Sequence, residues 1–350
     1  MNAAPGLPMA DLSPVLGSHL SQFDLAELDT FSFTDWVWRA ISGDLDLTLG
    51  GIISEFTRTF FSELMQNGDL IRQLLVIAIL AGFIRCLSDS FKAESAGKVA
   101  FYVSYILIIA TAVNSFRIAT LILSDLIRQT TGMMQAAVPL MVSLTAMSGN
   151  IASAAVLNPV LFMGLTIMAR FIAYIFIPLV TAAAVLHMLD YMAGGETFTK
   201  SVDVIKGFAK SALKFIVFCF LSLLALQKVS APIANNLALR TARAAAGAVP
   251  VVGGALNSAM DTVVNLSAAA KSGVLVALVV VICMAVAVPL IKLLSFMFVY
   301  RLIAALIQPI CDEKMVKCLD GLADYIGMLF YAGVLVSIMF VFACVIVLMF

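Results

Sequence analysis

The sequence predicts an all-α polytopic transmembrane helical bundle of about six to eight spans, preceded by an amphipathic helical segment outside the cytoplasm. Hydrophobic residues make up 62% of its 350 residues, charged residues make up only 12%, and the mean hydropathy is +1.07. Soluble chains carry about a quarter charged residues, whereas here the deficit is concentrated in long uncharged runs. This composition excludes a water-soluble cytosolic enzyme.

Acidic and basic residues are distributed unevenly along the chain, although each class has 21 members. Residues 1–70 contain ten acids and two bases, whereas residues 71–350 contain eleven acids and nineteen bases. Lysine and arginine accumulate in the cytoplasmic loops of membrane proteins. Residues 1–70 are therefore predicted to lie outside the cytoplasm, and residues 71–350 are predicted to form the transmembrane domain.

The predicted extracytoplasmic region has two parts. Residues 1–32 are rich in Pro, Gly, Ser and Asp without a sustained period, which predicts a mobile tail. They lack the basic start and apolar run of a signal peptide, so export implies that a native signal has been removed. Residues 33–70 have helical spacing of apolar residues and contain both tryptophans, Trp36 and Trp38. Because indole rings concentrate at membrane interfaces, this segment is predicted to lie on the outer membrane surface or to pack as a lid on the spans.

Charged and polar breaks divide residues 71–350 into apolar runs. The longest run, residues 151–189, would make a helix of about 58 Å, whereas the hydrocarbon core is about 30 Å thick. Its middle has no turn-forming cluster, so we predict one long helix kinked near Pro178. The lysine-rich stretch 190–214 is predicted to be a cytoplasmic connection. The other predicted apolar segments are 74–84, 99–123, 133–147, 212–226, 273–310 and 325–350.

The second half of the chain repeats the order of features of the first half at an offset of 111, which aligns Pro139 with Pro250. Each half has a short small-residue segment with a proline, a long apolar run with a proline, a charged stretch and a final span. This order predicts repeats over residues 128–238 and 239–350, although apolar sequences also match by chance, so both explanations stay open. The charged stretch of the second copy, residues 311–324, is predicted to be a loop.

The sequence has no catalytic signature: it lacks a Walker A loop, a dinucleotide-binding glycine motif, a zinc-protease motif and a nucleophile elbow. Its two histidines, His19 and His187, lie far apart in the chain. His187 is predicted to cap a helix or to lie at an interface. The six cysteines have neither disulfide nor zinc spacing. We therefore predict no enzymatic activity, no cofactor and no metal site.

Four bases, Arg117, Arg170, Lys292 and Arg301, lie inside apolar runs. A charge at mid-bilayer costs about 2.5–3.5 kcal/mol on insertion scales, so each base needs a partner, a wet cavity or a route to the interface. One explanation is that the long side chains reach the interface. The other is a positively lined path or a docking face for acidic partner segments. Lys292 and Arg301 point to opposite helix faces at about 100° per residue, and Arg301 is predicted to be paired inside the assembly.

The segment 242–259 consists almost entirely of small residues. It predicts close helix packing or a re-entrant turn that lines a cavity. The run LALRTARAAAGAVPVVGGALNSAMDTV, residues 237–263, and the run VYRLIAALIQPICD, residues 299–312, resemble the stage III sporulation protein AE family of endospore-forming bacteria. SGNIASAAVLNP, residues 148–159, resembles it too, and the similarity extends over residues 33–350.

The resemblance implies a multi-pass component of a secretion-like channel complex in the mother-cell membrane surrounding the forespore, required for late forespore gene expression. The implied partners are the other proteins of the stage III sporulation A operon, including its secretion-type ATPase and ring-forming membrane proteins, a forespore-side channel partner and the lipid bilayer. No nucleic acid is implied, and a homo-oligomer is left open. The family has no catalytic residues to carry over.

Two other classes of function stay open from the sequence. A stand-alone secondary transporter would account for the repeat and the intramembrane bases. A structural anchor for the channel rings would need neither transport nor catalysis. The candidate functional residues are Arg170, Lys292, Arg301, Arg240, Arg243, Pro250, Gly253 and Gly254.

Overall fold

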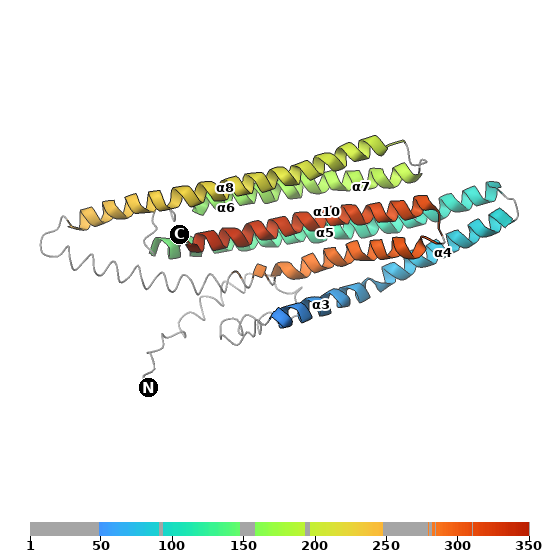
Figure 1. Cartoon of the computed structure of the whole chain (residues 1–350), viewed down its shortest axis with the longest axis horizontal. Coiled ribbons are helices and arrows are strands. Elements are labelled where there is room, and N and C mark those ends of the chain that lie inside the picture. The colour runs from blue at the N-terminus through green and yellow to red at the C-terminus, as the bar shows by residue number, and fades with distance from the viewer. Residues whose placement is uncertain are drawn as a thin grey trace, which may run out of the picture. The chain divides into compact units, whose positions relative to one another are not determined.

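The computed structural model describes residues 49–90, 94–147, 158–192, 197–247, 285–309 and 311–349, together with residues 279, 282 and 283. Every regular element in these ranges is a helix, and none of the residues described here forms a strand. The prediction of an all-α polytopic bundle is confirmed. In chain order the helices are α3 (Leu49–Gln66), α4 (Gly68–Ser90), α5 (Glu94–Met147), α6 (Asn158–Phe171), the π-helix η4 (Ile172–Phe176), α7 (Ile177–Met192), α8 (Thr199–Gly247) and α10 (Glu313–Met349) (Figure 1).

A further helix, Ala285–Ile307, precedes α10 and is named the 285–307 helix. Five described helices are long and apolar enough to cross a membrane. Helices α3 and α4 pass the same test only as a pair, bent by 46°, so the count rises to six if the pair is one broken span. The prediction was six to eight spans, and the described ranges supply five or up to six. The five are 102–143 of α5, 158–192 of α6 to α7, 199–230 of α8, the 285–307 helix and 313–346 of α10.

Helix α5 runs without a break through residues that the sequence analysis divided into two apolar segments. It has 54 residues and includes Pro139. The stretch between the two predicted segments, residues 124–132, contains no proline and only one glycine, so nothing in it ends a helix. The backbone carbonyl freed by a proline is tolerated in membrane helices. The prediction of a separate segment at 133–147 was wrong.

Helix α8 begins inside the stretch 190–214 that was predicted to connect two spans. Asp190 of α7 accepts hydrogen bonds from Phe198 N–H at 2.6 Å and from Thr199 Oγ1 at 2.7 Å. A carboxylate next to the first turn satisfies free N–H groups and complements the helix dipole. Most of the lysine-rich stretch is therefore helical.

Helix α10 likewise includes most of the predicted loop 311–324. Its first turns contain an i,i+4 ion pair of 2.6 Å between Glu313 and Lys317, a spacing that stabilises helices. Apolar residues of the same turns are buried at helical spacing, which explains why the charged stretch folds as an amphipathic helix. These buried residues are Met315, Cys318, Leu319 and Leu322.

Helices α6, η4 and α7 form one continuous helix of 35 residues, as the sequence predicted for this run. The π-helical segment Ile172–Phe176 ends two residues before Pro178. Proline donates no N–H and its ring crowds the preceding turn, so a wider turn relieves that contact. The distortion predicted near Pro178 therefore takes the form of a π-helical turn.

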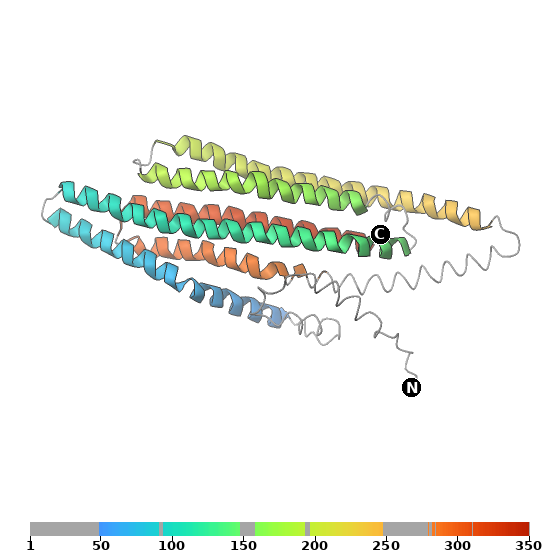
Figure 2. The same ribbon diagram turned by 180° about the vertical axis from the view of Figure 1, so that it is seen from behind.

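Helix α10 contacts α5, α6, α7 and α8, and it lies beside α5 in both views of the ribbon (Figures 1 and 2). Three glycines spaced six residues apart permit this close packing. A Cβ on Gly333 would lie 3.0 Å from Leu290 and 3.1 Å from Leu126, and a Cβ on Gly327 would lie 3.1 Å from Met297. Without side chains at these positions the backbones approach closely, as small residues allow in membranes.

The third of these glycines, Gly321, packs against His187 of α7. A Cβ at Gly321 would overlap the imidazole ring. The ring also lies edge to face with Tyr191 and Tyr325, at centroid distances of 5.0 and 5.4 Å. His187 therefore packs between α7 and α10 and does not cap the end of a helix, and the alternative prediction of an interfacial position stays a prediction.

A ladder of polar side chains joins α5, α6 and α8, and we name Thr145, Asn158 and Gln227 the polar ladder. Asn158 Nδ2 donates to Thr145 Oγ1 at 3.3 Å, and Gln227 Nε2 donates to Asn158 Oδ1 at 3.3 Å. All three residues are buried. Interhelical hydrogen bonds of this kind stabilise membrane bundles by about 0.6 kcal/mol each, with a maximum of about 1.7 kcal/mol.

We expect Asn158→Leu to lower the free energy of unfolding by about 1–3 kcal/mol, because it removes both hydrogen bonds and leaves Gln227 without its acceptor. Denaturant unfolding of the detergent-solubilised protein measures the change. Ser222→Ala is the control, since the exposed Ser222 hydroxyl bonds only to its own helix. Equal stability of Asn158→Leu and the parent protein would show that the ladder does not hold the three helices together.

Candidate functional site

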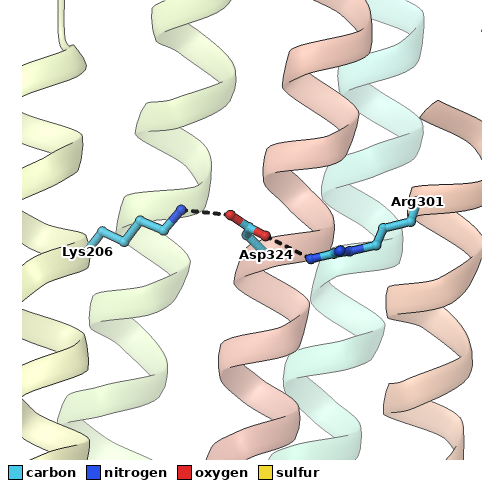
Figure 3. A network of polar contacts seen from close by, with 3 residues as sticks. All are labelled: Lys206, Arg301 and Asp324. Carbon is cyan, nitrogen blue, oxygen red and sulfur yellow. Dashed lines mark hydrogen bonds and ion pairs between the residues drawn. The ribbon is translucent and has the colours of Figure 1, made fainter. Parts of the chain in front are cut away.

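Three charged side chains from three helices meet in a cluster, which we name the charge cluster. Asp324 of α10 lies between Lys206 of α8 and Arg301 of the 285–307 helix (Figure 3). Lys206 Nζ donates to Asp324 Oδ2 at 3.0 Å, and Arg301 Nη2 donates to Asp324 Oδ1 at 3.2 Å. Each carboxylate oxygen thus accepts from a different helix, and the three residues together carry one net positive charge.

Local structure fixes the position of each member of the cluster. The amide and hydroxyl contacts to Asp190 start α8 at Thr199, which places Lys206 in its second turn. The Lys206 ammonium also lies 5.2 Å from the centre of the Tyr325 ring, a cation–π distance. Tyr325 in turn touches His187, so the charge cluster adjoins the close contact between α7 and α10.

The charge cluster is partly exposed, and this limits its contribution to stability. The exposed fractions of the side chains are 24% for Lys206, 43% for Asp324 and 56% for Arg301. Exposed ion pairs contribute about 0–1 kcal/mol each because solvent screens them. The two ion pairs therefore contribute little to the stability of the fold. Their main effects are to align the three helices relative to one another and to place charged groups at the surface.

A polar groove of about 590 Å³ opens beside Arg301. It extends over the end of the 285–307 helix and the first turns of α10, so it lies next to the charge cluster. Both acidic and basic side chains line this groove. In the described part of the chain, no group of three or more His, Cys, Asp or Glu side chains is arranged to bind a metal ion. The polar lining residues are Arg301, Gln308, Glu313, Lys317 and Asp320.

The charge cluster lies where the uncharged part of α10 begins. From Tyr325 to Phe350, α10 and the final residue carry no charge. Along α8, Lys206 and the ladder residue Gln227 are 21 residues apart, which is about 31 Å, and the hydrocarbon core is about 30 Å thick. The charge cluster and the polar ladder are therefore separated by about the thickness of the membrane core, and the exposed Lys210 and Lys214 of α8 lie between them.

The structure places two of the sequence-predicted bases beside acids. Arg301 is paired with Asp324, and Lys292 lies close enough to Glu63 of α3 for electrostatic attraction. The acids nearest to the two bases thus belong to different helices. Arg170 is exposed on α6, and it forms no ion pair with any residue that the structure describes.

The structure describes only some of the remaining candidate functional residues. Arg240 and Arg243 belong to the last turns of α8. Pro250, Gly253 and Gly254 lie outside the described residues. The roles predicted for these five residues stay predictions.

Sequence reasoning missed Asp324 and Lys206 as partners of Arg301. Lys206 and Asp324 are 118 residues apart in the chain, and Arg301 and Asp324 are 23 apart. Local periodicity carries no information over such separations. One signal was present, because Asp324 is the last charge before an uncharged stretch that extends to Phe350, and a charge at that boundary faces a partner or the interface.

The comparison with known families decides the identity of the chain. A family model described as Stage III sporulation protein AE matches residues 31–350. The chain belongs to the stage III sporulation protein AE family. A relative named Stage III sporulation protein AE, from Bacillus subtilis (strain 168), is 30% identical over 302 residues, which cover 86% of this chain and 75% of the relative. No solved structure matches the chain.

Membership of the stage III sporulation protein AE family gives the protein a role in sporulation. The apolar helices make it a multi-pass membrane protein. The family match includes every described helix, so the charge cluster, the groove and the polar ladder all belong to the matched region.

Proposed function

We propose that the protein is the membrane-embedded component of a secretion-like channel that links mother cell and forespore. In this proposal it lies in the mother-cell membrane surrounding the forespore, has no enzymatic activity, and is required for late forespore gene expression and endospore formation. The observation that carries the proposal is a polytopic bundle of a sporulation family with a charged groove at one end of its helices.

The distribution of bases supports a cytoplasmic location for the groove. The charged end of the bundle contains the first turns of α8 and α10 and the last turns of the 285–307 helix. Lysines and arginines concentrate there, which favours the cytoplasmic side. A cytoplasmic ATPase and ring-forming membrane proteins of the same operon are the proposed partners of this surface. The described bases at this end are Lys200, Lys206, Lys210, Lys214, Arg301, Lys314 and Lys317.

The course of α3 and α4 extends the same argument to the N-terminal region. Phe60 contacts Phe298 of the 285–307 helix, and the Ala78 carbonyl accepts from Cys311 Sγ at the charged end. The chain therefore runs toward the charged end, and α3 starts away from it (Figure 1). This direction supports an extracytoplasmic side for the residues that precede α3.

We expect cysteines introduced by Ser21→Cys or Ser42→Cys to react with an impermeant thiol reagent added outside unengulfed cells. The acidic balance of this region and the direction of α3 are the physical reasons. Labelling is compared before and after lysis, with the parent chain as control for its own cysteines. Reaction only after lysis would place the region in the cytoplasm.

The proposed function is tested by purification of the tagged protein from sporulating cells. Co-purification with the ATPase and the ring-forming proteins of the operon, and loss of late forespore gene expression in a deletion strain, are expected. Solute uptake by the isolated protein in liposomes would favour a stand-alone transporter. Loss of ring assembly without loss of permeation would favour a structural anchor.

A further inference from the structure

Helix α5 carries a polar face that no described helix covers. Asn114, Asp125, Arg128, Gln129, Gly132 and Gln135 are all exposed. At 100° per residue these positions, with Arg117 and Ala136, fall within about 120° of one helix side, which also carries the exposed Ile118 and Leu121. We name this side the α5 polar face.

The α5 polar face lies deep in the membrane core. Leu123 and Leu126 of α5 contact the Gly333 position of α10. Gly333 is nine residues beyond Asp324 along α10, which is about 13 Å from the charge cluster toward the end of the chain. Asp125 and Arg128 flank Leu126, and they lie near the middle of the candidate span Tyr102–Ser143 of α5.

Lipid is an unfavourable neighbour for this face. The Asp125 and Arg128 side chains are 54% and 82% exposed, and even as an ion pair they would face hydrocarbon with N–H donors and lone pairs that have no hydrogen-bond partner. Arginine reaches an interface with its long side chain, but aspartate is too short to do so. The face therefore needs a polar partner.

We propose that the α5 polar face is the contact surface between two copies of this chain. Asp125 Oδ1 and Arg128 Nη2 pair at 3.1 Å within the helix, so the two charges cancel before they are buried. The guanidinium has further N–H donors and the carboxylate has further lone pairs. In a dimer with a two-fold axis along the membrane normal, the side of α5 that carries Asp125 faces the side of the second copy that carries Arg128. The surface is therefore complementary in charge to itself.

The shape of the face suits the same partner. No atom of the protomer lies within 4 Å of a Cβ placed on Gly132. Gly132 and Ala136 make a small-xxx-small spacing, and Gln129 and Gln135 on either side supply interhelical hydrogen bonds. Close approach of two α5 helices at Gly132 would bring these glutamines within reach of each other. This inference is independent of the channel function proposed above.

Oxidative cross-linking in membranes tests the proposal. Ala136→Cys on the α5 polar face is expected to give a covalent dimer after oxidation with copper phenanthroline. Phe218→Cys is the matched control, because Phe218 of α8 is 67% exposed on an apolar face. It is expected to give no more dimer than the parent chain, whose own cysteines set the background.

A second substitution separates folding from association. Gly132→Leu meets open space inside the protomer, so it is expected to leave the unfolding temperature of the monomer unchanged while abolishing the Ala136→Cys dimer. Gly207→Leu, at a glycine of α8 with no atom within 4 Å, is expected to leave the dimer intact.

Two results would overturn the proposal. One is a dimer yield for Ala136→Cys that equals the yield for Phe218→Cys or persists with Gly132→Leu. The other is rapid labelling of Gln129→Cys by an impermeant thiol reagent in intact membranes, which would show that the face lines water instead of a second copy.

Discussion

Replacing Gly321 by alanine is expected to lower the free energy of unfolding by about 1–3 kcal/mol, the usual cost of overpacking a tight core. A Cβ at this position overlaps the His187 ring, which Tyr191 and Tyr325 hold in place. In an open helical position the same substitution would instead stabilise the fold by about 0.5–1 kcal/mol, because glycine is a poor helix former. Denaturant unfolding of the detergent-solubilised protein shows directly whether the free energy of unfolding falls or rises.

The change in the free energy of unfolding caused by Gly321→Ala should reverse its sign when the His187 side chain is removed. In a His187→Ala background the space for the new Cβ is open, so Gly321→Ala is expected to stabilise the protein relative to His187→Ala alone. Gly207→Ala is the matched control, since no atom lies within 4 Å of its Cβ position, and it should stabilise both backgrounds alike. Additive effects of Gly321→Ala and His187→Ala would show that the two residues do not contact each other in the folded protein.

The sequence predicted those parts of the fold that depend on local composition. Apolar runs of sufficient length predicted the membrane helices, and the absence of turn residues between 151 and 189 predicted one long helix. The errors concern helix ends. Charge was interpreted as a loop signal at 190–214 and at 311–324, although lysine, glutamate and leucine are all good helix formers.

The contacts between distant segments could not be predicted in the same way. His187 and Gly321 are adjacent only because α7 and α10 pack together, and one sequence contains no record of that pairing. Arg301 was predicted to have a partner from its position in an apolar run, but its spacing could not identify Asp324. The central position of Asp125 in a span was equally hidden, since it follows from the continuation of α5 through residues 124–132.

Loss of the Arg301 side chain is expected to abolish sporulation while the protein still inserts. Arg301→Leu removes one of the two bases on Asp324 and changes the charge beside the groove. The stability cost should be about 1 kcal/mol or less, because the pair is partly exposed and screened by solvent. A large functional effect with a small stability effect is therefore the predicted signature. Sporulation frequency at matched protein levels, together with denaturant unfolding, measures the two separately.

A double-mutant cycle tests whether Arg301 acts through Asp324. Asp324→Asn keeps the shape of the side chain but removes its charge, leaving Lys206 and Arg301 as neighbouring cations without a common acid. If the pair acts as a unit, the double variant Arg301→Leu, Asp324→Asn should unfold with a smaller loss of stability than the sum of the two single losses. Lys292→Leu should have a mild effect on sporulation, because Lys292 points to Glu63 of α3 and lies away from the charge cluster. A normal sporulation frequency for Arg301→Leu with a severe defect for Lys292→Leu would move the functional charge to the contact with α3.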